Sequence, residues 1–174
     1  MRIIRNLMSM LSTLVVIVMV ALAILLVGVR AVGLTPYTVL SGSMEPTYHV
    51  GSLIYVRAID AQDIEVGTPL TFRAAGDAMV ATHRVNELVT IDGETCYITK
   101  GDANNMPDPP VSYDQVIGTP VFSIPYLGYF STWLQSGAGV IAGIALAAML
   151  LLSLLLSELL PKAEKPTQPH PESE

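Results

Sequence analysis

Two long apolar runs lie near the ends of the chain, and short apolar segments separated by turn residues lie between them. The first run, Leu11–Val29, holds nineteen residues without a charge. As a helix it is about 28 Å long, close to the ~30 Å hydrocarbon core of a bilayer, and it exceeds the roughly 7–15 apolar residues of a cleavable signal peptide. The second run, Gly137–Leu156, holds twenty uncharged residues. The pattern predicts two transmembrane helices, at residues 7–30 and 137–157.

Between the two runs, residues 37–118 have the short-period pattern of β structure. A hairpin is predicted at Asp92-Gly93, because this dipeptide accepts the positive φ angles of a two-residue turn. No stretch of the region shows a sustained 3.6-residue period of apolar positions, so no long helix is expected there. The fold class is therefore mainly β, with a small β domain at residues 31–136 between the two helices. The four segments with the strongest strand pattern are Leu53–Val56, Pro69–Phe72, Arg84–Val89 and Cys96–Thr99.

The charges beside the two apolar runs predict how the chain is oriented in a membrane. Arg2 and Arg5 make the N-terminal segment, residues 1–6, basic. This predicts a cytoplasmic N-terminus, with Arg30 as a weak opposing signal. The β domain then lies on the extracytoplasmic side, and the tail, residues 158–174, returns to the cytoplasm. Because the tail is rich in Pro, Glu and Lys, it is expected to be disordered.

Composition supports a chain in contact with a lipid bilayer and argues against other partners. Half of the residues (51%) are apolar and only 14% are charged, which is more apolar than an average soluble domain. Tyr126, Tyr129 and Trp133, just before the second run, are typical of the aromatic belt at a bilayer surface. Residues 37–136 contain four Lys/Arg and eleven Asp/Glu, and an acidic region argues against nucleic acid as a partner. The single cysteine, Cys96, excludes an internal disulfide.

The segment Leu40–Thr47 is the strongest candidate for chemistry. It reads Leu-Ser-Gly-Ser-Met-Glu-Pro-Thr, and this mixture of Ser, Gly and Pro predicts a sharp turn. Such a turn can expose one hydroxyl and direct nearby N–H groups to the same point, as a nucleophilic serine requires. The residues alone leave open whether Ser41 or Ser43 is the nucleophile. An isolated Ser-Gly-Ser is more often only a turn that caps a strand.

A serine nucleophile needs a base, and His83 in Thr-His-Arg-Val is the best candidate. A second segment, Lys100–Asp108, offers carboxylates that could orient the imidazole. His49 lies only six residues past Ser43, where the short loop leaves little freedom to turn back. His170 lies in the tail, on the other side of the predicted membrane. Lys100, the only lysine of the middle region, is the alternative base.

Three motifs, Ser-Gly-Ser-Met-Glu-Pro-Thr, His-Arg-Val and Lys-Gly-Asp-x-Asn-Asn-x-x-Asp, occur in this order in the chain. In this order and at these separations they resemble the type I signal peptidases. They are most similar to the ER-type branch of eukaryotes, archaea and some sporulating Gram-positive bacteria, which uses histidine where other bacterial enzymes use lysine. The resemblance runs from about residue 37 to residue 130.

The resemblance implies a role for each candidate residue. Ser43 would be the nucleophile and His83 the general base. Ser41 and the Ser43 backbone N–H would hold the oxyanion. Asp102 and Asp108 both match aspartates of the family. We favour Asp108 as the triad member and Asp102 as a residue that shapes the loop, although the residues themselves do not decide between them.

The implied function is a membrane-bound serine endopeptidase that removes signal peptides from secreted preproteins. The substrate would lie extended against an exposed sheet edge. No metal or nucleotide motif is present, so no cofactor is expected. The second apolar run favours a prokaryotic plasma membrane over the ER, and the need for accessory membrane subunits is left open. The chain departs from the family at Ser52, where an aspartate is usual, and in the stiff run Pro107–Pro110.

Two other functions remain open from the sequence. One is a cysteine transpeptidase of sortase type that uses Cys96, although a free cysteine inside a strand is usually a small buried apolar residue. The other is a membrane-anchored binding module without activity, against which the complete Ser/His/Asp set argues.

Overall fold

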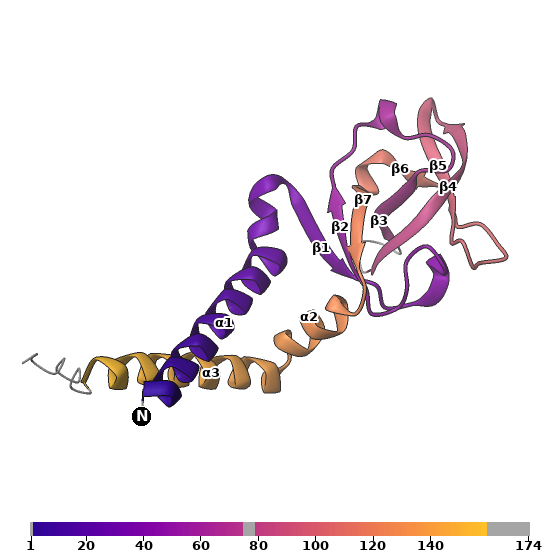
Figure 1. Cartoon of the computed structure of the whole chain (residues 1–174). Helices are drawn as coiled ribbons and strands as arrows, with labels where there is room; N and C mark the ends of the chain where they lie inside the picture. The colour runs from indigo at the N-terminus through magenta and orange to yellow at the C-terminus, as the bar shows by residue number, and fades with distance from the viewer. Residues whose placement is uncertain (1, 75–78, 160–174) are drawn as a thin grey trace, which may run out of the picture.

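The protein is an antiparallel β domain from which two long helices extend (Figure 1). A computed structural model describes the backbone of residues 2–74 and 79–159, and the side chains of residues 10–74 and 79–152. The helices are α1 (Arg2–Leu26), α2 (Leu127–Gln135) and α3 (Gly137–Leu159). The strands are β1 (Leu34–Thr38), β2 (Leu53–Arg57), β3 (Pro69–Ala74), β4 (Met79–Ile91), β5 (Glu94–Lys100), β6 (Val111–Ser112) and β7 (Val116–Ile124).

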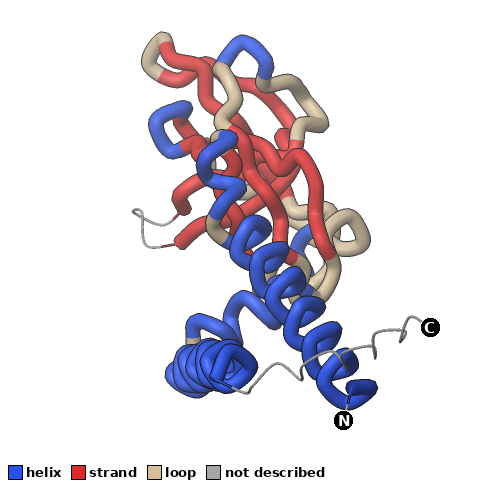
Figure 2. Tube along the Cα trace, turned by 60° about the vertical axis from the view of Figure 1, so that its left-hand side comes forward, coloured by secondary structure: helices blue, strands red, loops and turns tan. Residues whose placement is uncertain are grey.

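The seven described strands form one sheet in the order β1-β2-β7-β3-β4-β5-β6, with antiparallel pairs throughout. Figure 2 shows the strands gathered in the β domain, with the long helices outside it. The four strands predicted from β-branched and aromatic runs are confirmed as parts of β2, β3, β4 and β5. The hairpin at Asp92-Gly93 is also confirmed, since β4 pairs with β5 across it and both residues have positive φ, 52° and 85°.

Three strands were not predicted: β6, which has only two residues, and β1 and β7, whose patterns proline and glycine interrupt. β1 contains Pro36 and lies at an edge of the sheet, where a missing N–H costs little. β7 contains Pro120 and Gly118, and its pairing with β2 and with β3 is shifted by irregularities. Proline and glycine inside a strand are characteristic of such irregular places.

Buried apolar side chains form two clusters, one toward the helices and one beneath the centre of the sheet. The first joins Val29, Leu34, Leu53 and Tyr55. The second is made of Ile64, Leu70, Val85 and Tyr97. Together they fix the relative positions of β2, β3, β4 and β5, which flank the candidate site.

The first helix ends earlier than the apolar run that predicts it. α1 ends at Leu26, and residues Gly28–Val32 form a short 3-10 turn. The side chain of Val29 is 9% exposed and packs in the first cluster, because the chain bends here toward β1. The last residue of the run, Val29, therefore belongs to the domain core.

The second apolar run is helical as predicted, and α3 meets α2 at an angle of 87°. Within the described residues, no single helix has the length and apolar character to cross a membrane, whereas the bent pair Leu127–Gln135 and Gly137–Leu152 meets both criteria together. Two spanning helices and the domain boundaries that depend on them stay predictions. Most of the tail that is predicted to be disordered, residues 160–174, lies outside the described residues.

Candidate active site

A short 3-10 turn, Gly42–Met44, carries the candidate nucleophile Ser43. Met44 is 2% exposed and anchors the turn in the domain. Ser41 precedes the turn in extended conformation, and its hydroxyl oxygen lies 3.4 Å from Ser43 Oγ. The predicted turn is thus present, with the two serine hydroxyls side by side.

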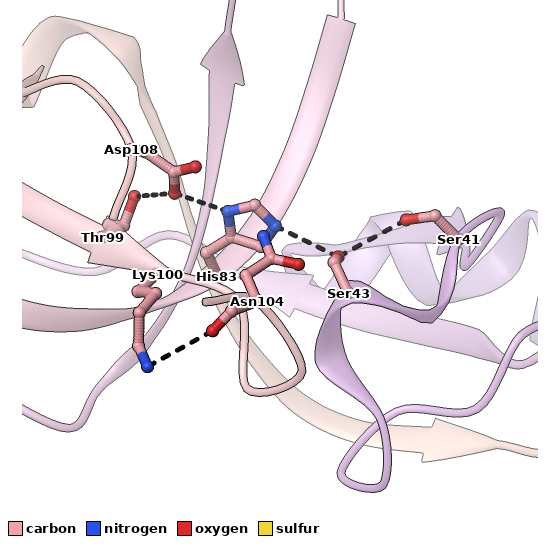
Figure 3. Close-up of polar contacts among 7 residues, drawn as sticks. All are labelled: Ser41, Ser43, His83, Thr99, Lys100, Asn104 and Asp108. Carbon is pink, nitrogen blue, oxygen red and sulfur yellow. Dashed lines mark hydrogen bonds and ion pairs between the residues drawn. The ribbon is translucent and has the colours of Figure 1, made fainter. Parts of the chain in front are cut away.

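The structure brings Ser43, His83 and Asp108 together in one chain of contacts (Figure 3). Ser43 Oγ lies 3.1 Å from His83 Nε2. On the other side of the ring, His83 Nδ1 lies 2.5 Å from Asp108 Oδ2. The side chains of His83 and Asp108 are 12% and 23% exposed, so water reaches them only in part.

The network determines which ring nitrogen of His83 carries the proton. An ionised carboxylate only accepts hydrogen bonds, so the Nδ1–H group donates to Asp108. In the neutral ring Nε2 is then an acceptor, and it faces the Ser43 hydroxyl. Asp108 Oδ2 accepts a second hydrogen bond, 2.7 Å long, from the Thr99 hydroxyl. These contacts hold the imidazole in the tautomer that can accept the serine proton.

Asp102 lies in a different network, formed with Arg84 and Thr47. The Arg84 guanidinium donates from Nε to Asp102 Oδ1 at 2.8 Å and from Nη2 to Oδ2 at 2.7 Å. The Thr47 hydroxyl donates to Asp102 Oδ2 at 2.5 Å. The hydrogen bond from Arg84 and then that from Thr47 hold the pKa of Asp102 below its ordinary value, against the opposing effect of burial. Asp102 thus joins the loop after Ser43 to the strand that carries His83.

The loop that follows β5 also touches the backbone of the serine turn. The Ala103 N–H donates to the Ser43 carbonyl oxygen at 2.9 Å. Gly101 lies so close that a Cβ atom there would be 2.5 Å from the same oxygen. Since real Cβ atoms essentially never come within 3.0 Å of such a neighbour, only glycine fits here without a shift. Gly101 and Ala103, on either side of Asp102, therefore set the position of the Ser43 backbone.

The structure places the competing candidates elsewhere. His49 is exposed and pairs with Glu45 at 2.5 Å. The Lys100 ammonium is directed to the Asn104 carbonyl oxygen at 3.4 Å and away from Ser43 (Figure 3). Cys96 is buried in β5, with 9% exposed. The other histidine candidate, His170, lies outside the described residues.

A free strand edge borders the site. β4 pairs with β3 from Met79 to Arg84, but in the described sheet β5 pairs with β4 only from Arg84 onward. Residues 79–83 therefore leave one edge of their backbone without a partner strand. Residues 36–41, at the outer edge of the sheet, line the same groove as residues 79–83, and the groove contains Ser43. An extended peptide can lie between these two segments and form main-chain hydrogen bonds.

Three residues of the site were missed by the sequence analysis: Thr47, Arg84 and Thr99. Thr99 occurs in a strand-like run, where threonine is explained by β propensity alone. Arg84 and Thr47 occur inside the motifs that were recognised, and their separation of 37 residues gave no sign that both would contact Asp102. The only signal was that Arg84 follows His83 directly and that Thr47 ends the motif that contains Ser43.

Comparisons with known proteins connect this geometry to a family. The family model described as "Signal peptidase, peptidase S26" matches residues 10–102, more than half of the chain. The chain is 40% identical over 86 residues to signal peptidase I W of Bacillus subtilis (strain 168), which covers 48% of this chain and 45% of that protein. It is 37% identical over 71 residues to the signal peptidase complex catalytic subunit SEC11C of Homo sapiens, which covers 40% of this chain and 37% of that protein.

A third relative is the signal peptidase complex catalytic subunit SEC11 of Colletotrichum graminicola. The identity is 35% over 107 residues, covering 56% of this chain and 62% of the relative. The chain thus spans less than two thirds of the length of each of these curated relatives.

Proposed function

Because the chain belongs to the signal peptidase family, peptidase S26, we propose that it is a membrane-bound serine endopeptidase of the ER-type branch that removes signal peptides from preproteins. The observation that carries the proposal is the contact chain from Ser43 through His83 to Asp108. A hydroxyl, an imidazole and a carboxylate in this order are the parts of a nucleophile, its base and the group that orients the base.

The first step is attack of Ser43 Oγ on the carbonyl carbon of the scissile bond. His83 Nε2, 3.1 Å from Oγ, accepts the hydroxyl proton. Asp108 stabilises the positive ring that results, because its carboxylate already accepts the Nδ1–H group. His83 then gives its proton to the leaving amine, and an acyl-enzyme on Ser43 remains. Water attacks this ester, again with His83 as the base, and frees the serine.

The developing negative charge on the substrate oxygen needs donors, and the serine turn supplies them. The Ser41 hydroxyl lies beside the nucleophile, 3.4 Å from Ser43 Oγ. With the Ser43 backbone N–H it forms the proposed oxyanion hole. The Ala103 N–H bond to the Ser43 carbonyl oxygen fixes the orientation of this turn.

Asp102 has a positioning role in this mechanism. It contacts Arg84, which directly follows His83 in the sequence, and Thr47, which lies four residues after Ser43. It thereby keeps the nucleophile turn and the histidine strand at their mutual distance. Asp108, which contacts the imidazole, is the proposed triad aspartate.

Anchoring in the membrane places this site near the bilayer surface. The exposed apolar side chains of α1 and α3 include Leu14, Ile17, Ile141 and Ile144. In lipid these side chains need no protein partner. We propose that α1 and the bent α2–α3 pair hold the chain in a membrane, with the β domain on the extracytoplasmic side. A prokaryotic plasma membrane stays the preferred location.

The sortase-type alternative rests on Cys96, whose environment does not favour it. The cysteine is 9% exposed, in a strand paired on both sides with β4 and β6. A reactive thiol requires solvent access and a polar environment that lowers its pKa. The serine mechanism is therefore the one we propose.

The test is cleavage of a labelled preprotein by the full chain in lipid vesicles. The wild type, Ser43→Ala and Cys96→Ala are compared. We expect Ser43→Ala to abolish cleavage and Cys96→Ala to retain it. Loss of cleavage in Cys96→Ala alone contradicts the proposal. Cleavage by the purified chain without added proteins also decides whether accessory subunits are needed.

A further inference from the structure

The loop after β5 places one more polar side chain beside the candidate nucleophile. Of residues 101–110, all of them described, only Asn104 lines the groove that contains Ser43 and His83. Figure 3 shows the Asn104 side chain extending from this loop toward Ser43 and His83. Asn104 is half-buried, so the groove shields its side chain in part from water.

The backbone contacts of the loop fix where this side chain lies. The Asn104 N–H donates to the Gly101 carbonyl oxygen at 2.9 Å, which closes a tight turn. The Ala103 N–H joins this turn to the Ser43 carbonyl oxygen. On the other side, the Lys100 ammonium donates to the Asn104 carbonyl oxygen at 3.4 Å. The turn is thus held both to the segment of the nucleophile and to the end of β5.

The Asn104 amide lies close to the backbone of Ser43 and is available to a ligand. A Cβ atom added to Gly101 would be 2.5 Å from the Ser43 carbonyl oxygen and 2.8 Å from Asn104 Nδ2, so these two atoms adjoin the same point. In the part of the chain that the structure describes, neither the oxygen nor the nitrogen of the amide has a hydrogen-bond partner. A half-buried amide therefore directs unpaired donors and an acceptor into the groove.

The path of a bound peptide brings one of its halves to Asn104. The free edge of β4, residues 79–83, ends at Arg84, where β5 begins to pair with β4. A peptide that lies along this edge must therefore leave the sheet beside His83. Arg84 pairs with Lys100, the last residue of β5, so the loop that carries Asn104 starts at the same place.

The half that leaves the sheet is the one after the scissile bond. Signal peptides carry their small-residue motif before the bond, and an extended segment binds through a strand edge. The two segments that border the groove, residues 36–41 and 79–83, offer such edges. Residues before the bond therefore occupy the groove, and residues after the bond continue past Ser43 to Asn104.

We propose that the Asn104 side-chain amide binds the main chain of the first residues after the scissile bond and so holds the leaving half of the substrate. This inference rests on the proposed function. A peptide group offers one N–H and one C=O, and the asparagine amide offers the complementary acceptor and donors. The contact needs no particular side chain in the substrate. Held in this way, the leaving amine stays within reach of His83, which must protonate it.

The test compares two asparagines of one loop and two substrates. Asn104→Ala removes the proposed contact. Asn105→Ala is the matched control, because Asn105 is exposed and does not line the groove. The first substrate is a cleavage-region peptide that continues for several residues past the scissile bond. The second has the same residues before the bond but ends in a methyl ester, so both give the same acyl-enzyme and only the first has a main chain for Asn104 to bind.

The full chain in lipid vesicles is assayed with each substrate. We expect Asn104→Ala to lower kcat/KM for the peptide about tenfold, as the loss of one hydrogen bond or two would do, and to leave kcat/KM for the ester within about twofold of wild type. Asn105→Ala should leave both values within about twofold. Equal losses on both substrates, no loss on either, or the same loss in both variants overturn the inference. If wild type cleaves neither substrate, the proposed function itself fails, and the inference falls with it.

A second measurement identifies the bound half of the peptide without cleavage. A photo-crosslinking amino acid replaces Asn104 or Asn105 in the Ser43→Ala variant, which leaves the peptide uncut. We expect adducts between residue 104 and the half after the scissile bond, and about tenfold fewer from residue 105. Adducts mainly with the half before the bond, or equal yields from the two positions, overturn the inference.

Discussion

Gly101→Ala tests whether the Gly-Asp loop sets the position of the nucleophile. The added Cβ would lie 2.5 Å from the Ser43 carbonyl oxygen, where an ordinary contact begins at 3.4 Å. The two backbones must therefore separate by about 1 Å, because the neighbour is a backbone atom and not the end of a flexible side chain. Ser43 Oγ would then leave hydrogen-bond distance of His83 Nε2, from which it is now 3.1 Å.

A displacement of about 1 Å in a catalytic group costs on the order of 10²-fold in rate. We expect kcat/KM of Gly101→Ala for a short cleavage-region peptide to fall by about this factor. Gly137→Ala is the control, since its Cβ meets nothing within 4 Å. Far-UV circular dichroism should show the same β content in both variants. A Gly101→Ala enzyme within threefold of wild type would refute the reasoning, because the serine turn would then tolerate the added atom.

Three further predictions concern single side chains. Asp108→Asn should lower kcat by roughly 10⁴-fold with an unchanged fold, because an amide can hold His83 in the wrong tautomer; a loss below tenfold in the same peptide assay counts against Asp108 as the triad aspartate. In the folded state the hydrogen bond from Arg84 lowers the pKa of Asp102. The ionised Asp102 carboxylate therefore stabilises the fold fully above the unfolded pKa of about 3.9, and this stabilisation is lost as pH falls through the folded pKa. The melting temperature of Asp102→Asn should thus be below that of wild type at pH 7, with a gap that narrows below about pH 4; a gap independent of pH contradicts the ion pair. Tyr55→Phe should keep or raise the melting temperature. The buried Tyr55 hydroxyl has no hydrogen-bond partner among the described residues, and an unpaired buried hydroxyl costs about 1–3 kcal/mol. A fall of several degrees would show that the hydroxyl is bonded.

The parts of the fold that the sequence predicts are those with local signals. The Asp92-Gly93 hairpin and the strand before it can be predicted because the turn and the strand pattern lie side by side in the sequence. β7 was missed because Gly118 and Pro120 occupy it. The sheet accepts these two residues where the pairing of β7 with β3 and with β2 is irregular, and no local pattern shows this pairing. The end of α1 was also missed, since Val29 leaves the helix only to reach the domain core.

The candidate site shows the same limit. Its order along the chain, Ser43 then His83 then Asp108, came from the resemblance to a family, whereas the residues alone left Ser41 and Asp102 as equal alternatives. Asp102 and Asp108 differ in role because the loop after β5 directs the Asp102 carboxylate to Arg84 and the Asp108 carboxylate to His83. Contacts of this kind join residues 18 and 25 positions apart and cannot be inferred from either segment alone.

The central claim is that Ser43 and His83 act as one catalytic unit, and a double-mutant cycle on peptide cleavage tests it most directly. The rates of Ser43→Ala, His83→Ala and the double variant are measured with the same short peptide. When two groups serve one step, removing both costs little more than removing either. The account predicts that the double variant is as slow as the slower single variant. Losses that multiply in the double variant would contradict it, because the serine and the histidine would then act independently.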